Sequence, residues 1–379
     1  MIKSQKHLFS LEEDVTYING AFMSPLLKSA SEIGKLQVDS KLRPYQITGN
    51  DFFSNVELVK KEFSTMINAA NFDRIAIIPS VSYGIANVVK NVNIKNKEIL
   101  VVAEQFPSNI YPWMELEASQ NAKLKVISPP DTLESRGKKW NEYLLESINE
   151  ETGMVAIAHV HWADGTLFNL KEIRKRTLEV GALLIIDGTQ SVGAYPFDVN
   201  EIKPDALICA GYKWLMGPYG MGVAYYGSAF ESGSPIEQNW INRKDSENFA
   251  ELVNYQKKYQ PGSGRYSMGE QSNFILLPML LESLKQLNKW NVTEIQTYCE
   301  AITKAPIEKI REKGYWVEEL GYRSSHLFGI RKQGLNVEKL KQQLEDNRIF
   351  VSIRGSSIRV SPNVYNTEED LMKLVEILN

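Results

Sequence analysis

The strongest constraint on the fold is a pair of short apolar runs within residues 182–222. The runs, at residues 182–186 and 206–209, contain β-branched side chains and are bounded by turn residues, a pattern typical of buried parallel strands. Asp187 follows the first run, and Lys213 follows the second in a loop rich in glycine and proline. In an open α/β sheet, ligands bind beyond the carboxyl ends of the strands. We therefore expect Asp187 and Lys213 to lie at one ligand site.

An aspartate and a lysine at this place suit pyridoxal phosphate as cofactor. The carboxylate pairs with the protonated ring nitrogen, so that the ring can accept electrons, and the amine forms a Schiff base with the aldehyde. Burial and nearby cations would keep Lys213 partly neutral. Once substrate displaces it, the same amine can move protons on and off the substrate Cα. The sequence therefore predicts an enzyme with Lys213 as catalytic residue and Asp187 as partner of the ring nitrogen.

The motifs around these residues resemble the class V aminotransferase family. The segments DGTQSVG (187–193) and GYKWLMGPYGMG (211–222) are similar to its cofactor site, and the resemblance extends from Tyr17 to YNTEEDL at residues 365–371. The family includes cysteine desulfurases, kynureninase-like enzymes and isopenicillin N epimerase-like proteins. The resemblance implies the type I fold of pyridoxal-phosphate enzymes. This is an α/β fold with a mainly parallel seven-stranded sheet in a large domain and a smaller C-terminal α/β domain.

We expect three parts along the chain. Residues 1–30 would form an N-terminal segment near the active site, residues 31–258 the large cofactor-binding domain, and residues 259–379 the small C-terminal domain. A length of 379 residues suits two domains, and 43% hydrophobic with 23% charged residues is ordinary for a globular protein. Residues 228–260 show no clear period and predict a loop over the site.

The resemblance assigns further contacts to the cofactor. Val81 and Ser82 match a phosphate-binding turn at the start of a helix, where backbone N–H groups are free to bind an anion. Phe106 matches the residue that stacks on the pyridine ring, Gln190 would donate a hydrogen bond to the phenolate oxygen, and the Tyr212 hydroxyl would reach the phosphate. The alternatives are an ordinary helix cap for the serine and a core position for the phenylalanine.

Two residues are assigned to the substrate. Arg359 matches the family's clamp for the substrate α-carboxylate, and a bidentate guanidinium suits a planar carboxylate. Arg354 is a second candidate for this role. Asn19, in a segment that lines the substrate side of the cofactor in the family, would approach the ligand; the alternative is a surface turn. For the nearby His159 and Asp164 a structural role is favoured.

One further residue is expected to contact the cofactor of the partner subunit. Ser272 lies in a glycine-rich segment similar to the one that crosses to the partner's active site, where a hydroxyl commonly touches the other subunit's phosphate. Ser267 is the alternative. The resemblance thus implies a homodimer with the active site at the subunit interface.

The expected reaction depends on a missing residue. Desulfurases carry a nucleophilic cysteine shortly before the carboxylate-binding arginine, and the segment VSIRGSSIR at residues 351–359 has none. Cys209 lies in an expected strand and Cys299 in an expected helix, so persulfide chemistry is disfavoured. We expect an aminotransferase that acts on a small amino acid and an oxo acid. The alternatives are an isopenicillin N epimerase-like racemase or epimerase, a selenocysteine or cysteine lyase-type elimination, and a binding module that has lost catalysis.

Composition disfavours several other classes. A net charge of -3 without a basic run gives no reason to expect nucleic acid or an anionic membrane as partner. Two distant cysteines form neither a disulfide framework nor a metal cluster, which fits a reducing compartment. The start of the chain lacks the apolar region of a signal peptide, so a cytoplasmic location is expected. No G-x-G-x-x-G follows the first strand, which disfavours a nicotinamide dehydrogenase.

Overall fold

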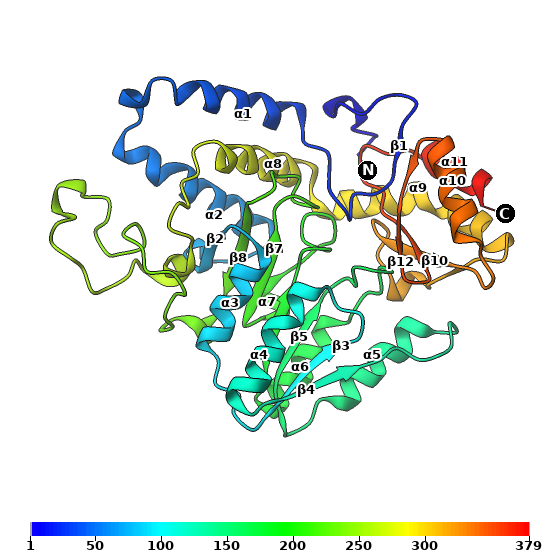
Figure 1. Ribbon diagram of the computed structural model, residues 1–379, viewed down its shortest axis with the longest axis horizontal. Helices are drawn as coiled ribbons and strands as arrows, with labels where there is room; N and C mark the ends of the chain where they lie inside the picture. Colours follow the sequence, from blue (N-terminus) through cyan, green and yellow to red (C-terminus); the bar gives the residue numbers. More distant parts are fainter. Residues whose placement is uncertain (1, 379) are drawn as a thin grey trace.

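The structure, a computed structural model, describes residues 2–378. At its centre lies a sheet of seven strands in the order β2-β8-β7-β6-β5-β3-β4 (Figure 1). The strands are β2 (Ile75–Ile78), β3 (Glu98–Val102), β4 (Lys123–Ile127), β5 (Thr152–Ala158), β6 (Leu183–Asp187), β7 (Ala206–Ala210) and β8 (Gly222–Tyr226). All run in one direction except β8, which is antiparallel to its neighbours. The mainly parallel seven-stranded sheet is therefore confirmed.

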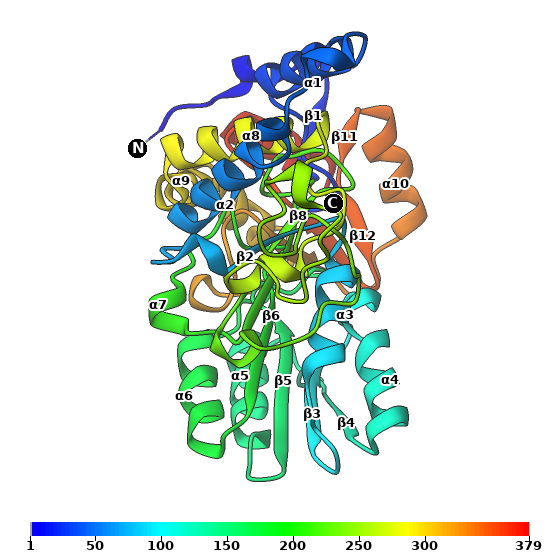
Figure 2. The same ribbon diagram turned by 90° about the vertical axis from the view of Figure 1, so that its left-hand side faces the viewer.

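Helices cover both faces of this sheet (Figure 2), which explains why its inner strands are mostly apolar, whereas the edge strand β4 carries Lys123 and Lys125. Val101 of β3 packs in one apolar cluster with Trp113. Its neighbours Leu100 and Val102 point to the other face and pack in a cluster with Trp140. The helices in this part of the chain are α1 (Lys28–Ser40), α2 (Ser54–Met66), α3 (Val81–Asn91), α4 (Tyr111–Gln120), α5 (Arg136–Ser147), α6 (Leu170–Val180), α7 (Val199–Ile202) and α8 (Leu276–Trp290).

The last third of the chain forms a smaller α/β unit around a four-stranded sheet in the order β12-β13-β10-β9. All of its strand pairs are antiparallel. Its elements are α9 (Val292–Glu312), β9 (Trp316–Val317), β10 (Phe328–Arg331), α10 (Val337–Asp346), β12 (Ser352–Arg354), β13 (Ser357–Val360) and α11 (Glu368–Ile377). The smaller domain is thus confirmed. Its start at residue 259 stays a prediction, and α8, which follows that point, packs against α1 and α2.

The N-terminal segment is joined to this smaller unit. Strand β1 (Thr16–Tyr17) pairs in parallel with β11 (Ile349–Phe350), and Asn19 bridges to Ser361. The Ser361 N–H donates to the Ile18 carbonyl at 2.9 Å. In Figure 1 the dark-blue start of the chain accordingly lies beside the orange and red C-terminal elements.

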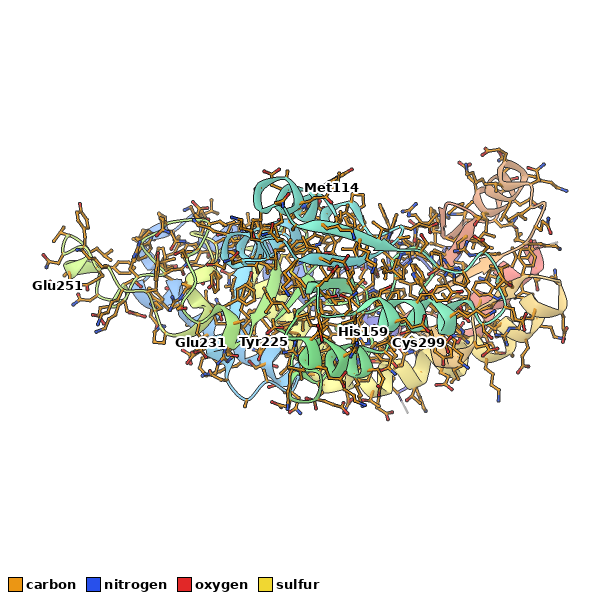
Figure 3. The ribbon with its side chains drawn as sticks, turned by 90° about the horizontal axis from the view of Figure 1, so that it is seen from below. Met114, His159, Tyr225, Glu231, Glu251 and Cys299 are labelled. Carbon is orange, nitrogen blue, oxygen red and sulfur yellow. The ribbon has the colours of Figure 1, made fainter. Side chains whose placement is uncertain are left out.

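Within residues 228–260, the segment starts in the body of the molecule, where Phe230 belongs to a core cluster, and then forms an arm that projects from it (Figure 1). Figure 3 shows Glu251 on this arm at one end of the molecule. The base of the arm is held by edge-to-face packing among Phe52, Trp240, Phe249 and Phe274. No helix formed by residues 2–378 is both long and apolar enough to cross a lipid bilayer.

A buried carboxylate ties the two sheets together. Asp164 follows β5, and its Oδ2 accepts hydrogen bonds from Arg136 of α5 at 2.8 Å and from Arg331 of β10 at 2.9 Å. Its Oδ1 accepts from the Thr166 hydroxyl at 2.9 Å and lies 3.2 Å from His161 Nδ1. Burial raises the pKa of Asp164, but His161 and the two guanidinium groups outweigh burial and hold that pKa far below its usual range. The structural role favoured for Asp164 agrees with these contacts.

Replacing this carboxylate should destabilise the fold. We expect Asp164→Asn to lower the free energy of unfolding by about 3–5 kcal/mol, because two guanidinium groups lose their buried counter-charge. Urea unfolding measures the change. The matched control is Glu312→Gln, which removes an exposed pair with Lys309 and should leave the free energy of unfolding almost unchanged. An equal effect of the two substitutions would contradict the prediction.

Candidate active site

Most of the predicted cofactor residues meet in a cavity of about 230 Å³ at the carboxyl ends of β5, β6 and β7. Asp187 is the last residue of β6, and Lys213 lies in the loop after β7. Both side chains are buried. The predicted residues that line the cavity are Val81, Ser82, Phe106, Asp187, Gln190, Tyr212 and Lys213. The two ends of neighbouring parallel strands therefore bring the amine and the carboxylate to one site.

The electrostatics of Lys213 favour a partly neutral amine. Burial lowers the pKa of Lys213 to about 8; the carboxylate of Asp187 opposes this effect, and Arg359 and Arg354 add to it. The amine lies 5.4 Å from the centre of the Phe106 ring. An amine with such a pKa exists near neutral pH in both the neutral form, which is nucleophilic, and the protonated form.

Asp187 is held in place by the turn that follows it. Its Oδ1 accepts a hydrogen bond from the Thr189 N–H at 2.9 Å. Burial raises the pKa of Asp187, while the bonds from Thr189 and the charge of Lys213 lower it. A cationic partner would stabilise the ionised form of this buried carboxyl group, and the protonated ring nitrogen of a pyridine would supply one.

The other end of the cavity is suited to an anion. Ser80 caps α3 with its hydroxyl, which accepts from the Tyr83 N–H at 3.2 Å. The Oγ atoms of Ser80 and Ser82 lie 3.0 Å apart, and the N–H groups of the first helical turn have no partner within the helix. Together with the amine, the carboxylate and the aromatic face of Phe106, these groups fit pyridoxal phosphate.

Hydrogen bonds that were not expected from the sequence hold Gln190 in place. Its Oε1 accepts from the Trp214 indole at 2.8 Å, and its Nε2 donates to the Ala21 carbonyl at 3.1 Å. Its backbone carbonyl lies 2.8 Å from His326 Nε2. Burial lowers the pKa of His326 to about 4, so the imidazole is neutral and donates this bond. One amide proton of Gln190 is left for a ligand, and its predicted bond to the phenolate oxygen stays a prediction.

Arg359 and Asn19 lie beside the cavity rather than on its wall. Arg359 donates from Nη1 to the Trp162 carbonyl at 2.8 Å and from Nη2 to the Ser352 hydroxyl at 3.2 Å. That hydroxyl donates to Asn19 Oδ1 at 2.8 Å. Asn19 is 8% exposed, whereas Phe22 in the turn that follows it is 54% exposed, and an approach of Asn19 to the ligand stays a prediction. Trp162 itself lines the cavity and places the two predicted substrate residues at its edge.

The two serines that were expected to contact the partner subunit's phosphate form hydrogen bonds within their own chain. Ser272 donates to the Phe52 carbonyl at 2.7 Å, and Ser267 accepts from the Ile77 N–H at 3.0 Å. Neither lines the cavity, and a contact with a partner's phosphate stays a prediction. The arm at residues 228–260, expected over the site, contributes no residue to the cavity wall of its own chain.

Additional residues line the cavity without having been assigned from the sequence. Ser80 had a readable signal, because a serine directly before an apolar helical pattern is a common N-cap. Thr189 and Tyr219 lie within the two segments that resemble the family's cofactor site, whereas the local pattern around Gln105 gives no sign that tertiary packing brings it to the cavity. These residues include Ser80, Gln105, Trp162, Thr189 and Tyr219.

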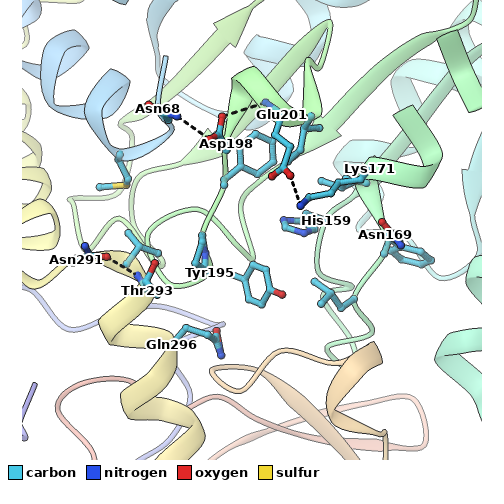
Figure 4. Close-up of a pocket in the computed structure, with 18 of the residues that line it drawn as sticks. Asn68, His159, Asn169, Lys171, Tyr195, Asp198, Glu201, Asn291, Thr293 and Gln296 are labelled. Atoms are coloured by element: carbon cyan, nitrogen blue, oxygen red, sulfur yellow. Dashed lines mark hydrogen bonds and ion pairs between the residues drawn. The ribbon is translucent and has the colours of Figure 1, made fainter. Parts of the chain in front are cut away.

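A second cavity, of about 880 Å³, lies between α6, α7 and the start of α9 (Figure 4). His159, Tyr195 and Glu201 are among its lining residues, and none of the residues predicted for the cofactor or substrate lines it. Burial lowers the pKa of His159 to about 3, so this imidazole is neutral. We therefore assign the chemistry to the smaller cavity, where the titratable groups are complementary.

Neither thiol lies in an environment that would activate it. Cys209 of β7 and Cys299 of α9 are fully buried. Burial raises the pKa of both thiols above the ordinary value. A nucleophilic thiolate needs exposure and a lowered pKa, so neither cysteine is suited to that role.

Comparison with known proteins adds independent information. A family model described as Aminotransferase class-V matches residues 42–374. Uncharacterized aminotransferase YcbU of Bacillus subtilis (strain 168) is 24% identical over 375 residues, 98% of this chain and 95% of its own. A probable cysteine desulfurase of Mycoplasma genitalium is 23% identical over 311 residues, 78% of this chain and 72% of its own.

Among solved structures, a mutant of C-DES with glycine covalently linked to the PLP cofactor superposes with a TM-score of 0.86. The match covers 99% of this chain and 98% of that one at 18% identity. At 18% sequence identity, this structural similarity shows a shared fold and nothing more.

Proposed function

This chain belongs to the class V aminotransferase family, whose enzymes use pyridoxal phosphate, and we propose that it transfers the amino group of a small amino acid to an oxo acid. The observation that best supports an amino-acid substrate is Arg359. Its guanidinium is 1% exposed, its Nε has no hydrogen-bond partner, and no Asp or Glu of residues 2–378 forms an ion pair with it. A buried cation of this kind calls for an anionic ligand, and a carboxylate matches its geometry.

The chain's own residues then have distinct tasks. The bound cofactor supplies an aldehyde that takes up the amino group and a ring that accepts electrons from Cα. Asp187 keeps the ring nitrogen protonated, and Arg359 holds the α-carboxylate. Lys213 would take the proton from Cα and deliver it to the carbon of the former aldehyde group, for which a pKa of about 8 is suited. Phe106 and Trp162, whose rings meet edge to face at 5.4 Å, exclude water from this step.

The experiment that tests the reaction uses the purified yellow protein and a panel of L-amino acids. Transamination releases the matching oxo acid while the amino group stays on the protein until an oxo-acid acceptor is added. Exchange of the Cα proton in D₂O with change of configuration, and no oxo acid, would instead indicate an epimerase. Release of ammonia with the oxo acid from cysteine or cystine would indicate elimination. Failure of borohydride to label Lys213 would favour a binding module without catalysis.

We also propose a homodimer in the cytoplasm. Large apolar side chains on the outside of the described chain support the dimer, among them Leu42 at 76%, Tyr45 at 81% and Tyr255 at 93% exposure. Sedimentation of the purified protein tests it. The two free buried cysteines fit a reducing compartment.

The uptake of cofactor should depend on pH through Lys213. Below pH 8 the amine is mostly protonated and cannot attack an aldehyde, and above pH 8 it is mostly neutral. We expect the rate constant for uptake of pyridoxal phosphate by the apoprotein to rise about tenfold per pH unit up to about pH 8 and then to level off. Stopped-flow absorbance measures this rate. A profile that still rises steeply at pH 10 would show an unshifted amine.

A further inference from the structure

Two arginines share one face of the hairpin formed by β12 and β13. In this antiparallel pair Ser352 lies opposite Arg359, and Arg354 lies opposite Ser357. Side chains two residues apart on a strand, and those directly opposite on its neighbour, point to the same face. The sequence spacing and the register therefore direct the guanidinium groups of Arg354 and Arg359 to the same side.

Both guanidinium groups meet Trp162 at the edge of the candidate active site. Arg359 donates to the Trp162 carbonyl at 2.8 Å, and the guanidinium of Arg354 lies 5.6 Å from the centre of the Trp162 ring. Trp162 lines the cavity that contains Lys213. Arg359 is fully buried and Arg354 half-buried, so the pair forms an inner and an outer cationic position.

Neither arginine has a counter-ion within the described chain. No Asp or Glu of residues 2–378 forms an ion pair with either one, and the Nε atoms of both are buried without a hydrogen-bond partner. Arg354 donates from Nη1 to the carbonyl of its neighbour Ile353. By contrast, Arg136 and Arg331 share the carboxylate of Asp164.

The two cations also repel each other. Burial and, to a smaller extent, the charge of Arg354 lower the pKa of Arg359 to about 9. A single α-carboxylate has two oxygens and satisfies one guanidinium in the bidentate mode. An amino acid with a neutral side chain would therefore leave one of the two cations beside the site without an anion, at a cost in free energy.

We propose that the substrates carry a second acidic group, a carboxylate on the side chain, which Arg354 binds while Arg359 binds the α-carboxylate. The class is thus acidic amino acids and dicarboxylic oxo acids. This inference rests on the proposed function, because it names the amino donor and the acceptor that the same site takes. Arg354, at the outer position, binds the side-chain carboxylate. Arg359, at the inner position, binds the α-carboxylate that all amino acids share.

The kinetic test compares acidic amino acids with their neutral amides. For the wild-type enzyme we expect kcat/KM for L-aspartate or L-glutamate to exceed that for L-asparagine or L-glutamine by about 10- to 100-fold, the range of one charge-assisted hydrogen-bonded contact. Arg354→Gln should remove this preference and lower kcat/KM for L-aspartate by about tenfold or more relative to kcat/KM for L-alanine. Lys373→Gln, an exposed residue of α11, removes the same charge elsewhere and should leave the preference intact.

A binding test without turnover separates this inference from the proposed function. Calorimetry of the protein with succinate and with butyrate compares a dicarboxylate with a monocarboxylate of similar length. We expect succinate to bind about tenfold or more tightly in the wild type, and the difference to vanish in Arg354→Gln. This result would hold even if the amino-acid panel shows no transamination, in which case only the proposed function fails.

Two outcomes would overturn the inference. The first is an equal loss of kcat/KM for L-alanine and L-aspartate in Arg354→Gln, because Arg354 would then serve the α-carboxylate or support Arg359. The second is equal binding of succinate and butyrate by the wild-type protein. Either result would leave the assignment of Lys213 and Asp187 untouched.

Discussion

Replacement of Lys213 with alanine is expected to lower turnover of every amino acid by about 10⁴-fold or more, because the substitution removes both the amine that holds the aldehyde and the base at Cα. Borohydride reduction of the wild-type protein should fix the cofactor to the peptide that contains residue 213, and the variant should lose this label. Both the rate of oxo-acid formation and peptide mapping measure the effect.

The matched control is Lys60 of α2. Burial lowers the pKa of this half-buried lysine to about 8 as well, yet Lys60 does not line the cavity. Lys60→Ala should therefore keep the borohydride label and turnover within a few-fold of wild type. A label that moves to another lysine, or stays in Lys213→Ala, would show that the amine has been wrongly assigned.

Asp187→Asn is expected to lower kcat by about 10²- to 10³-fold, the range seen when one preorganised electrostatic contact is removed. The amide has almost the same shape and can still accept from the Thr189 N–H, but it carries no charge to hold a proton on the ring nitrogen. KM should change much less than kcat, because Asp187 does not contact the substrate in this assignment. Steady-state kinetics over a range of amino-acid concentrations that reaches saturation tests whether kcat falls while KM is retained.

Asp205→Asn provides the control for this substitution. Asp205 is also well buried and pairs with Arg174 at 2.9 Å, but it precedes β7, at the opposite end of the strand from Lys213. This variant should lose stability and keep kcat. If Asp187→Asn kept kcat within about tenfold of wild type, the role of the carboxylate at the ring nitrogen would be refuted.

The central part of the fold was predictable because its signals are local. Apolar runs that end on Asp187 and before Lys213 mark strands, and parallel strands bring their carboxyl ends together. Asn169 and Gly181 mark a helix in the same way. The Asn169 side chain accepts from the Glu172 N–H, and Gly181 ends α6 in the left-handed region with a φ of 71°. The family resemblance, the fold class and the cofactor are confirmed.

Other parts of the site depend on contacts between residues far apart in the chain, which local patterns do not encode. The support of Gln190 by Ala21 and His326 joins three separate segments. By sequence, Ser272 matches a position that contacts the partner subunit in the family. In the structure its hydroxyl donates a hydrogen bond to the Phe52 carbonyl of the same chain. The roles assigned to single residues toward cofactor, substrate and partner stay predictions for the variants above to test.

The parallel pairing of β1 with β11 has a consequence for the order in which the enzyme matures. The carbonyl of Ala21 holds Gln190, and its neighbours Ile18 and Gly20 are bonded to Ser361. A ribosome must therefore add more than three hundred residues after this N-terminal stretch before the stretch can dock. Gln190 would lack its bond to Ala21 in the nascent chain until the segment around Ser361 has been made. Loading with the cofactor would then follow the synthesis of this segment.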